Sequence, residues 1–204
     1  MKTQQLLKAS AIGIGIMVAF YLIILSFSYG LIQEMITLFS DPAFFESTAT
    51  APVMPPEFER FVTLGPLLGL IGCFAWLIPG LVSGLLYARW HNQTLPIESG
   101  AVKGGAAAGA ITNALGYFIV GLISTAVILP LQMQMMETVM NNAGAGVPPF
   151  PFGGFMAVMT VISLFCSLLF NGVLGAGIGA LGGLIGDSTS KGKSVDYAGG
   201  DVIG

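Results

Sequence analysis

Four long runs without charged residues dominate the hydrophobic pattern of the chain. They are Ala9–Gln33, Phe61–Ala88, Gly104–Met136 and Thr138–Gly186. Each is longer than the roughly 20 residues that a helix needs to cross a hydrocarbon core of about 30 Å. None alternates apolar and polar residues with a period of two, which argues against lipid-spanning strands and for helices. The pattern predicts an all-α integral membrane protein with transmembrane helices at about 9–31, 61–87, 100–129 and 155–186.

Glycine and alanine gather on one face of the later predicted helices, and large aliphatic residues occupy the other face. In water each such glycine would cost roughly 1 kcal/mol relative to alanine and cover no core. In a bilayer, small residues let helix backbones approach closely. We therefore predict a tight Gly/Ala-packed bundle with GxxxG-type contacts. The glycines expected at these contacts are Gly80, Gly84, Gly105, Gly109, Gly175, Gly179 and Gly183.

The first predicted helix carries only scattered small residues, Ser10, Gly13 and Ala19, so we expect it at the periphery of the bundle. The apolar run that follows its basic start is too long for the roughly 7–15-residue core of a signal peptide, so the helix is interpreted as retained. The four helices are expected to form one domain over residues 1–186. The polar stretch 187–204 has little to bury and is predicted to be a disordered cytoplasmic tail.

Proline and glycine mark the places where the predicted helices end or bend. Asp41-Pro42 is expected to stop a helical extension over Leu31–Ser40. Pro79 is expected to kink the second helix, because it frees the backbone carbonyl one turn earlier. Leu131–Asn142 can extend the third helix as an amphipathic segment, and Asn171-Gly172 is the expected weak point of the fourth.

Composition strengthens the membrane interpretation. The chain is 54% hydrophobic and only 8% charged, and its mean hydropathy is +0.86. Soluble domains carry roughly 25% charged residues. A chain with this composition cannot cover a globular surface with polar groups.

Basic residues predict the orientation of the helices. In a four-span arrangement only Arg60 falls on one side, and the other basic residues fall on the opposite side. These are Lys2, Lys8, Arg89, Lys103, Lys191 and Lys193. By the positive-inside rule, both chain termini and the 89–103 connection are cytoplasmic. The net charge of −3 offers no basic surface, so no nucleic-acid partner is expected.

Two glycine-rich stretches flank the predicted inner connection: GLVSGLLYARW (80–90) and ESGAVKGGAAAGA (98–110). Together they resemble the inner hairpin of many small prokaryotic membrane proteins. The resemblance implies a multi-pass protein of a prokaryotic plasma membrane and no particular activity. The expected partners are the lipid bilayer and other membrane-protein subunits or further copies of the chain.

Ionisable side chains are missing from the four charge-free runs, which also lack histidine. Proton relays, voltage sensors and intramembrane metal chemistry usually need such groups, so these functions are disfavoured. Tyr87 and Trp90 are expected at the inner interface, with His91 beside them as a solvated residue. An enzyme acting on lipid would have to use loop groups in Glu57–Arg60 or Arg89–His91. We therefore expect no catalytic activity and no cofactor.

Asn113 and Asn171 are the best polar candidates within the membrane. Each lies roughly a dozen to fifteen residues from the cytoplasmic end of its helix, and the two helices are neighbours. An amide in hydrocarbon seeks a partner, and such hydrogen bonds are worth about 0.6–2 kcal/mol. The two residues are interpreted as a possible polar pair that holds the helices together. Alternatively, they line a path for a small solute.

Sulfur-bearing side chains give two weaker signals. A cluster of methionines follows the third predicted helix: Met133, Met135, Met136 and Met140. Thioethers suit Cu(I), but nearby cysteine or histidine is lacking, so we favour gap filling or partner contact over a metal site. Cys73 and Cys166 are expected at similar depth and are interpreted as free thiols, with a bridge or a shared metal between them as the alternative.

Abundant close-packing surface combined with few reactive groups predicts a non-enzymatic membrane protein. It would serve as an accessory or assembly subunit of a membrane complex, or as a small homo-oligomer. The alternative is an oligomeric channel or transporter for a small neutral solute, lined by Asn113 and Asn171. Co-purifying proteins would distinguish the first hypothesis, and solute flux would distinguish the second.

Overall fold

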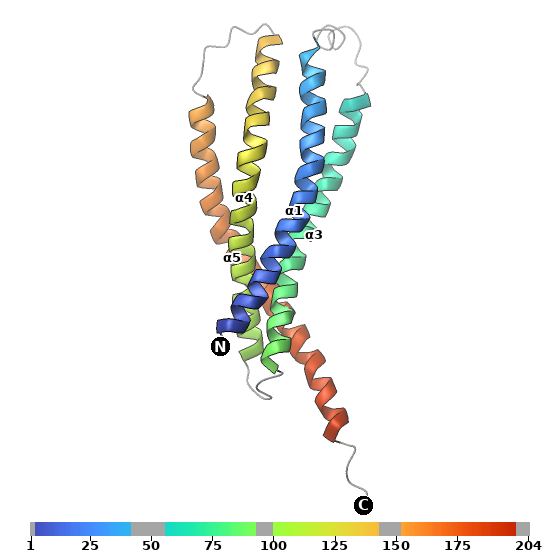
Figure 1. Cartoon of the computed structure of the whole chain (residues 1–204), viewed down its shortest axis with the longest axis vertical. Coiled ribbons are helices and arrows are strands. Elements are labelled where there is room, and N and C mark those ends of the chain that lie inside the picture. The colour runs from blue at the N-terminus through green and yellow to red at the C-terminus, as the bar shows by residue number, and fades with distance from the viewer. Residues whose placement is uncertain (1–2, 42–55, 93–99, 143–151, 199–204) are drawn as a thin grey trace, which may run out of the picture. The chain divides into compact units, whose positions relative to one another are not determined.

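The computed structural model describes residues 3–41, 56–92, 100–142 and 152–198, and these residues form four α-helices (Figure 1). The helices are α1 (Thr3–Ser40), α3 (Pro56–Asn92), α4 (Gly100–Asn142) and α5 (Phe152–Ala198). Each contains one predicted span and includes a segment long and apolar enough to cross a membrane. Within the described residues, the prediction of an all-helical protein with four membrane-length helices is confirmed.

The helices extend beyond the predicted spans. The segments Leu31–Ser40 and Leu131–Asn142 continue α1 and α4, and α1 ends directly before Asp41-Pro42. The Asp41 N–H donates a hydrogen bond to the Leu38 carbonyl at 3.3 Å, which closes the last turn. Pro42 disfavours a helical backbone at the residue before it, and this accounts for the end of α1.

The carboxyl-terminal helix differs from the expectation for 187–204. The sequence predicts a disordered tail after Gly186, whereas α5 continues to Ala198. A helix satisfies its backbone hydrogen bonds internally, so the loss of apolar residues after Gly186 does not by itself end it. The final residues, 199–204, lie outside the described part of the chain.

The chain divides into two compact units, and every helix contributes one segment to each. Unit 1 comprises the described parts of Met1–Ala19, Phe74–Val120 and Phe165–Gly204. Unit 2 comprises the described parts of Phe20–Cys73 and Gly121–Leu164.

Small side chains fill the core of unit 1. Ala9 of α1, Ala88 of α3 and Ala108 of α4 are completely buried, and Tyr87 of α3 is the largest side chain buried among them. A core of this kind brings helix backbones close together, because few bulky groups separate them.

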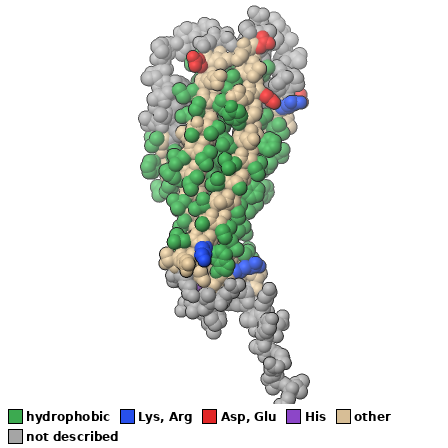
Figure 2. Space-filling view, viewed as in Figure 1, with side chains coloured by type: hydrophobic (Ala, Val, Ile, Leu, Met, Phe, Trp, Pro, Cys, Tyr) green, Lys and Arg blue, Asp and Glu red, His purple; other side chains and the backbone are tan. Residues whose placement is uncertain are grey.

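Larger side chains form the interior of unit 2. Among its described residues, the buried hydrophobic side chains are Leu25, Met35 and Ile36 of α1 and Leu131 of α4. Many other large hydrophobic side chains stay exposed, including Phe27 at 64% and Leu70 at 60%. Hydrophobic side chains cover much of the visible face of the described helices (Figure 2). Such a surface suits lipid rather than water.

Candidate functional site

A close helix contact in unit 1 joins α4 and α5 through glycine backbones. A Cβ atom placed on Gly109 would lie 2.6 Å from the Gly179 Cα, and one placed on Gly105 would lie 2.9 Å from the Gly183 Cα. Gly175 lies against the Gly109 carbonyl, 2.5 Å from such an added Cβ. The partner atoms are backbone, which cannot move aside as a flexible side chain can. Only glycine therefore fits at these positions without shifting a helix.

The α3 helix meets the same face of α5 from another side. Gly84 lies against the Gly179 backbone, with an added Cβ only 2.9 Å from the Gly179 Cα. Gly182 and Gly186 continue this contact along α5. An added Cβ on either would lie 3.0 Å from a backbone atom of Leu85, the nitrogen for Gly182 and the carbonyl oxygen for Gly186. Gly182 and Gly186 are absent from the predicted contact set, although both belong to the glycine-rich run that signals this face.

Asn113 of α4 occupies the centre of these contacts and is completely buried. A Cβ placed on Gly80 of α3 would lie 3.0 Å from the Asn113 Oδ1, and one placed on Gly175 of α5 would lie 2.6 Å from the Asn113 Cβ. Glycine on both flanking helices makes the space that the amide fills. Within the described residues, neither amide atom of Asn113 meets a hydrogen-bond partner.

Asn171 of α5 is also buried, but its amide is used locally. Its Nδ2 donates to the Ser167 carbonyl one turn earlier in α5, at 2.6 Å. Among the described residues, the amides of Asn113 and Asn171 therefore make no hydrogen bond to each other. They belong to the same region of the α4–α5 contact, because Gly172 faces Ala114 and Gly175 faces Asn113.

The α1 helix packs more closely in unit 1 than the sequence indicates. The Ser10 hydroxyl donates to the Ala108 carbonyl at 3.3 Å, and the Thr112 hydroxyl donates to the Ser10 carbonyl at 3.5 Å. A Cβ placed on Gly13 would lie 2.6 Å from the Thr112 Cγ2 and 3.0 Å from the Pro79 carbonyl oxygen. The expectation of a peripheral first helix is wrong for this segment. Two well-placed small residues suffice for a close contact, even where larger residues surround them.

The aromatic residues at the end of α3 form part of the core. Tyr87 is completely buried and stacks on His91, with ring centroids 5.6 Å apart and an interplanar angle of 15°. Gly104 of α4 lies against the Tyr87 ring, and Gly100 lies against the His91 ring. His91 is only 2% exposed. The prediction of a solvated His91 beside an interfacial Tyr87 is therefore wrong, because glycines at the start of α4 leave room for both rings.

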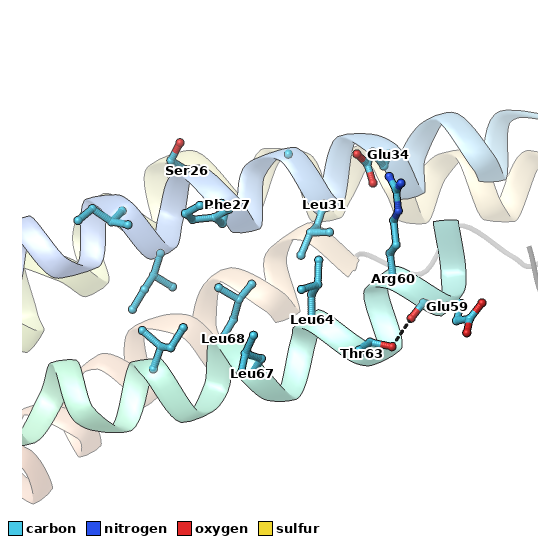
Figure 3. A pocket seen from close by; sticks show the side chains of 14 residues that line it. Ser26, Phe27, Leu31, Glu34, Glu59, Arg60, Thr63, Leu64, Leu67 and Leu68 are labelled. Atoms are coloured by element: carbon cyan, nitrogen blue, oxygen red, sulfur yellow. Dashed lines mark hydrogen bonds between the residues drawn. The ribbon is translucent and has the colours of Figure 1, made fainter. Parts of the chain in front are cut away.

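Unit 2 contains a groove of about 850 Å³ between α1 and α3 (Figure 3). Its walls are largely apolar side chains: Ile23, Phe27, Leu31, Leu64, Leu67 and Ile71. Charged residues line the groove as well, with Glu34 on α1 and Glu59 and Arg60 on α3. Figure 3 shows the Arg60 side chain extending toward Glu34, while the Thr63 hydroxyl bonds to the Glu59 carbonyl at 2.8 Å. The groove thus combines apolar walls with a basic and an acidic group from opposite helices.

A second space of about 580 Å³ in unit 2 lies between α1 and α4. Ser28, Ser124 and Gln132 are polar residues on its walls, and Met135 also lines it. The other methionines of the predicted cluster point outward: Met133 is 49% exposed, and Met136 and Met140 are each 39% exposed. Cluster residues spaced like these share one helix face, which suits partner or lipid contact.

Reactive groups are sparse in the described helices. Cys73 and Cys166 are free thiols with exposed side chains, so the alternative of a bridge between them is not observed. The described residues hold no cluster of three or more histidine, cysteine or acidic groups suited to a metal ion. Glu57, which the sequence places near Glu59 and Arg60, has a side chain outside the described set.

Comparison of the chain with protein-family models, curated proteins and solved structures finds no match. The features that bear on function are the helices, the glycine contacts around Asn113 and the groove of unit 2.

Proposed function

We propose that the chain is a non-enzymatic, multi-pass protein of the plasma membrane that functions by packing its helices against other membrane helices. It acts as an accessory or assembly subunit of a membrane complex, or assembles with copies of itself. In this proposal both termini and the 89–103 connection are cytoplasmic, as the distribution of basic residues predicts. The prokaryotic setting rests on the resemblance of its glycine-rich hairpin.

A contrast between two kinds of glycine carries the proposal. Glycines of unit 1 such as Gly109 and Gly179 are enclosed by the backbone of their own chain. In unit 2, an added Cβ at Gly69 or Gly72 of α3 would meet no atom within 4 Å among the described residues. Small residues on a membrane helix mark positions where another helix can approach closely. The open face of α3 is therefore the surface that we assign to a second membrane protein or a second copy.

Native extraction tests the proposal. The wild-type chain, extracted in a mild detergent, should migrate in a complex well above its own 21.2 kDa after correction for bound detergent. Gly69→Phe should release the chain from that complex, because the large ring blocks close helix approach. Gly177→Phe is the matched comparison, since Gly177 of α5 is similarly open but lies in unit 1. Release by Gly69→Phe and not by Gly177→Phe assigns the assembly surface to α3, and release by Gly177→Phe alone contradicts that assignment. A wild-type chain that is monomeric in membranes, measured by cross-linking before extraction, would contradict the proposal.

A channel or transporter for a small neutral solute is the second candidate, and the Asn113 amide favours it. A fully buried amide without a protein partner costs about 1–3 kcal/mol, so a polar solute or water that bonds to it would recover that loss. Against it, Gly80 and Gly175 enclose the amide closely, so passage would require α3 and α5 to separate from α4. Liposome flux of a small neutral solute that disappears in Asn113→Leu would support this candidate. Flux that persists in the Asn113→Leu/Asn171→Leu double variant would remove it.

A further inference from the structure

The groove of unit 2 has the length of one membrane leaflet. Its α1 wall runs from Ile23 to Glu34, and eleven residues of helix rise about 17 Å. Half of a hydrocarbon core of about 30 Å is about 15 Å. The apolar wall therefore matches the depth that one lipid acyl chain occupies, and its volume of about 850 Å³ lies within the range of ligand-binding pockets.

The charged groups of this groove, Glu34, Glu59 and Arg60, lie at one end, and the deeper part of its α3 wall is apolar. Glu59 and Arg60 lie near the amino-terminal end of α3, whereas Leu67 and Ile71 lie further along the same helix. Arg60 extends toward Glu34 from the opposite wall (Figure 3). All three charged side chains are exposed, so they are accessible to a bound headgroup. A basic group and an acidic group facing each other complement a headgroup that carries both charges.

We propose that this groove binds an amine-bearing zwitterionic glycerophospholipid. One acyl chain lies along the apolar walls, the phosphate accepts hydrogen bonds from the Arg60 guanidinium, and the primary ammonium donates to the Glu34 carboxylate. Guanidinium suits phosphate because it offers several N–H donors in a planar fork. A carboxylate favours a primary ammonium over a quaternary one, which has no N–H to donate, and it disfavours an anionic headgroup.

Small residues on α1 leave the space that an acyl chain needs. Gly30 and Ser26 line the groove one helical turn apart, and an added Cβ on Gly30 would meet no atom within 4 Å among the described residues. A larger side chain can therefore be accommodated at Gly30 without a clash with the chain itself. It would occupy the volume assigned to the lipid.

Native mass spectrometry of the purified full-length chain tests the assignment. Dioleoyl phosphatidylethanolamine, phosphatidylcholine and phosphatidylglycerol are titrated separately into the delipidated protein. Phosphatidylethanolamine should bind at one site about tenfold more tightly than the other two, because it alone satisfies both Arg60 and Glu34 with charge-assisted hydrogen bonds. Arg60→Gln should weaken its binding about tenfold, and Glu34→Gln should abolish its advantage over phosphatidylglycerol.

Variants that fill the groove test whether the lipid occupies it. Gly30→Phe should reduce phosphatidylethanolamine binding about tenfold, and Ser26→Phe should act in the same direction. Gly69→Phe is the matched control on α3, open in the same way but outside the groove lining, and should leave lipid binding unchanged. Circular dichroism confirms that each variant is folded.

Three results would overturn the assignment. Equal binding of the three lipids would indicate annular lipid only, and tighter binding of phosphatidylglycerol would indicate a simple anion site at Arg60. Unchanged binding in folded Gly30→Phe and Ser26→Phe would place the lipid elsewhere. The inference shares only the membrane location with the proposed function. Loss of assembly in Gly69→Phe and loss of lipid in Gly30→Phe therefore report on the two proposals separately.

Discussion

Glycine has two different roles in α5, and the sequence around them is nearly the same. Gly179 faces the backbone of α4, where an added Cβ would lie 2.7 Å from the Gly109 Cα. Two residues earlier, an added Cβ on Gly177 would meet no atom within 4 Å among the described residues. The periodicity of small residues identifies a packing face, but it does not show how closely each member is enclosed.

Alanine substitution should separate these two roles. Gly179→Ala should lower the free energy of unfolding by about 1–3 kcal/mol, because its methyl group overpacks a backbone contact. Gly177→Ala should leave the free energy of unfolding unchanged or raise it by up to about 1 kcal/mol, since alanine favours helix and the site is open. Reversible unfolding in mixed detergent and sodium dodecyl sulfate measures both values. Equal effects of the two substitutions would contradict the assignment of Gly179 to the contact.

The sequence predicts the role of a residue only where its spacing or its polarity indicates that role. A polar amide in a charge-free run predicts that Asn113 faces other helices, and the structure buries it between Gly80 and Gly175. The sequence does not predict the burial of Tyr87 and His91, because aromatic residues near a helix end are equally typical of an interface. The spacing of Gly100 and Gly104 is the sequence feature that indicates this burial. Two glycines one turn apart at a helix start leave room for rings from a neighbouring helix.

At the scale of the elements, α4 and α5 run antiparallel with a defined register in unit 1. Gly105 meets Gly183, Gly109 meets Gly175 and Ala114 meets Gly172. As the residue number in α4 increases, the number of the facing residue in α5 therefore decreases by a similar amount. Sequence alone gives the two faces but not this register, because many alignments of two glycine-rich stripes bring small residues together.

A designed disulfide tests the register directly. A Cβ on Gly172 would lie 3.6 Å from the Ala114 Cβ, which is within the usual range of about 3.5–4.5 Å for a disulfide. Ala114→Cys/Gly172→Cys, in a background with Cys73 and Cys166 replaced by alanine, should therefore form a bond within one chain under mild oxidation. Non-reducing electrophoresis with mass spectrometry of the linked peptides detects it.

The matched control for the disulfide moves one cysteine to the next residue of α4. Leu115 is 47% exposed, so Leu115→Cys/Gly172→Cys should cross-link poorly. Efficient cross-linking of the control pair would show that the register is wrong. A bond that forms only between two chains would show that the glycine contact belongs to an assembly of copies rather than to one chain.

The sequence predicts which segments are helical better than it predicts where each helix begins and ends. The four charge-free runs locate the four helices, because any backbone in lipid must satisfy its own hydrogen bonds. The same rule does not apply outside the lipid, where a polar segment can be helical or irregular. This is why the helical stretch after Gly186 in α5 could not be predicted, whereas Asp41-Pro42 correctly marked the end of α1.

For the whole molecule, the two units carry different charges among their described side chains. Lys8, Arg89 and Lys103 belong to unit 1 together with one acidic residue, Asp187. Unit 2 has Arg60 as its basic residue and four acidic residues: Glu34, Asp41, Glu59 and Glu137. This partition follows from the four-span arrangement, because each helix contributes one end to each unit. The positive-inside rule then predicts that the unit 1 end faces the cytoplasm.

Single cysteines at the two ends of α4 test that orientation. Thirty-four residues of helix separate Lys103 from Glu137, which is roughly 51 Å of rise and exceeds the roughly 40–45 Å thickness of a bilayer with its headgroups. Both side chains are exposed. In a background with Cys73 and Cys166 replaced by alanine, Glu137→Cys should react with a membrane-impermeant maleimide in intact cells. Lys103→Cys should react only after the membrane is permeabilised.

A third variant shows that labelling reports on water access rather than on exposure within the protein. Leu70→Cys lies in the apolar part of α3 and is exposed to its surroundings, so it should resist the maleimide before and after permeabilisation if lipid covers it. Labelling of Lys103→Cys in intact cells would invert the orientation, and with it the sidedness of the lipid groove. Labelling of Leu70→Cys in intact cells would count against membrane embedding itself, because a cysteine in hydrocarbon is protected from a water-borne reagent.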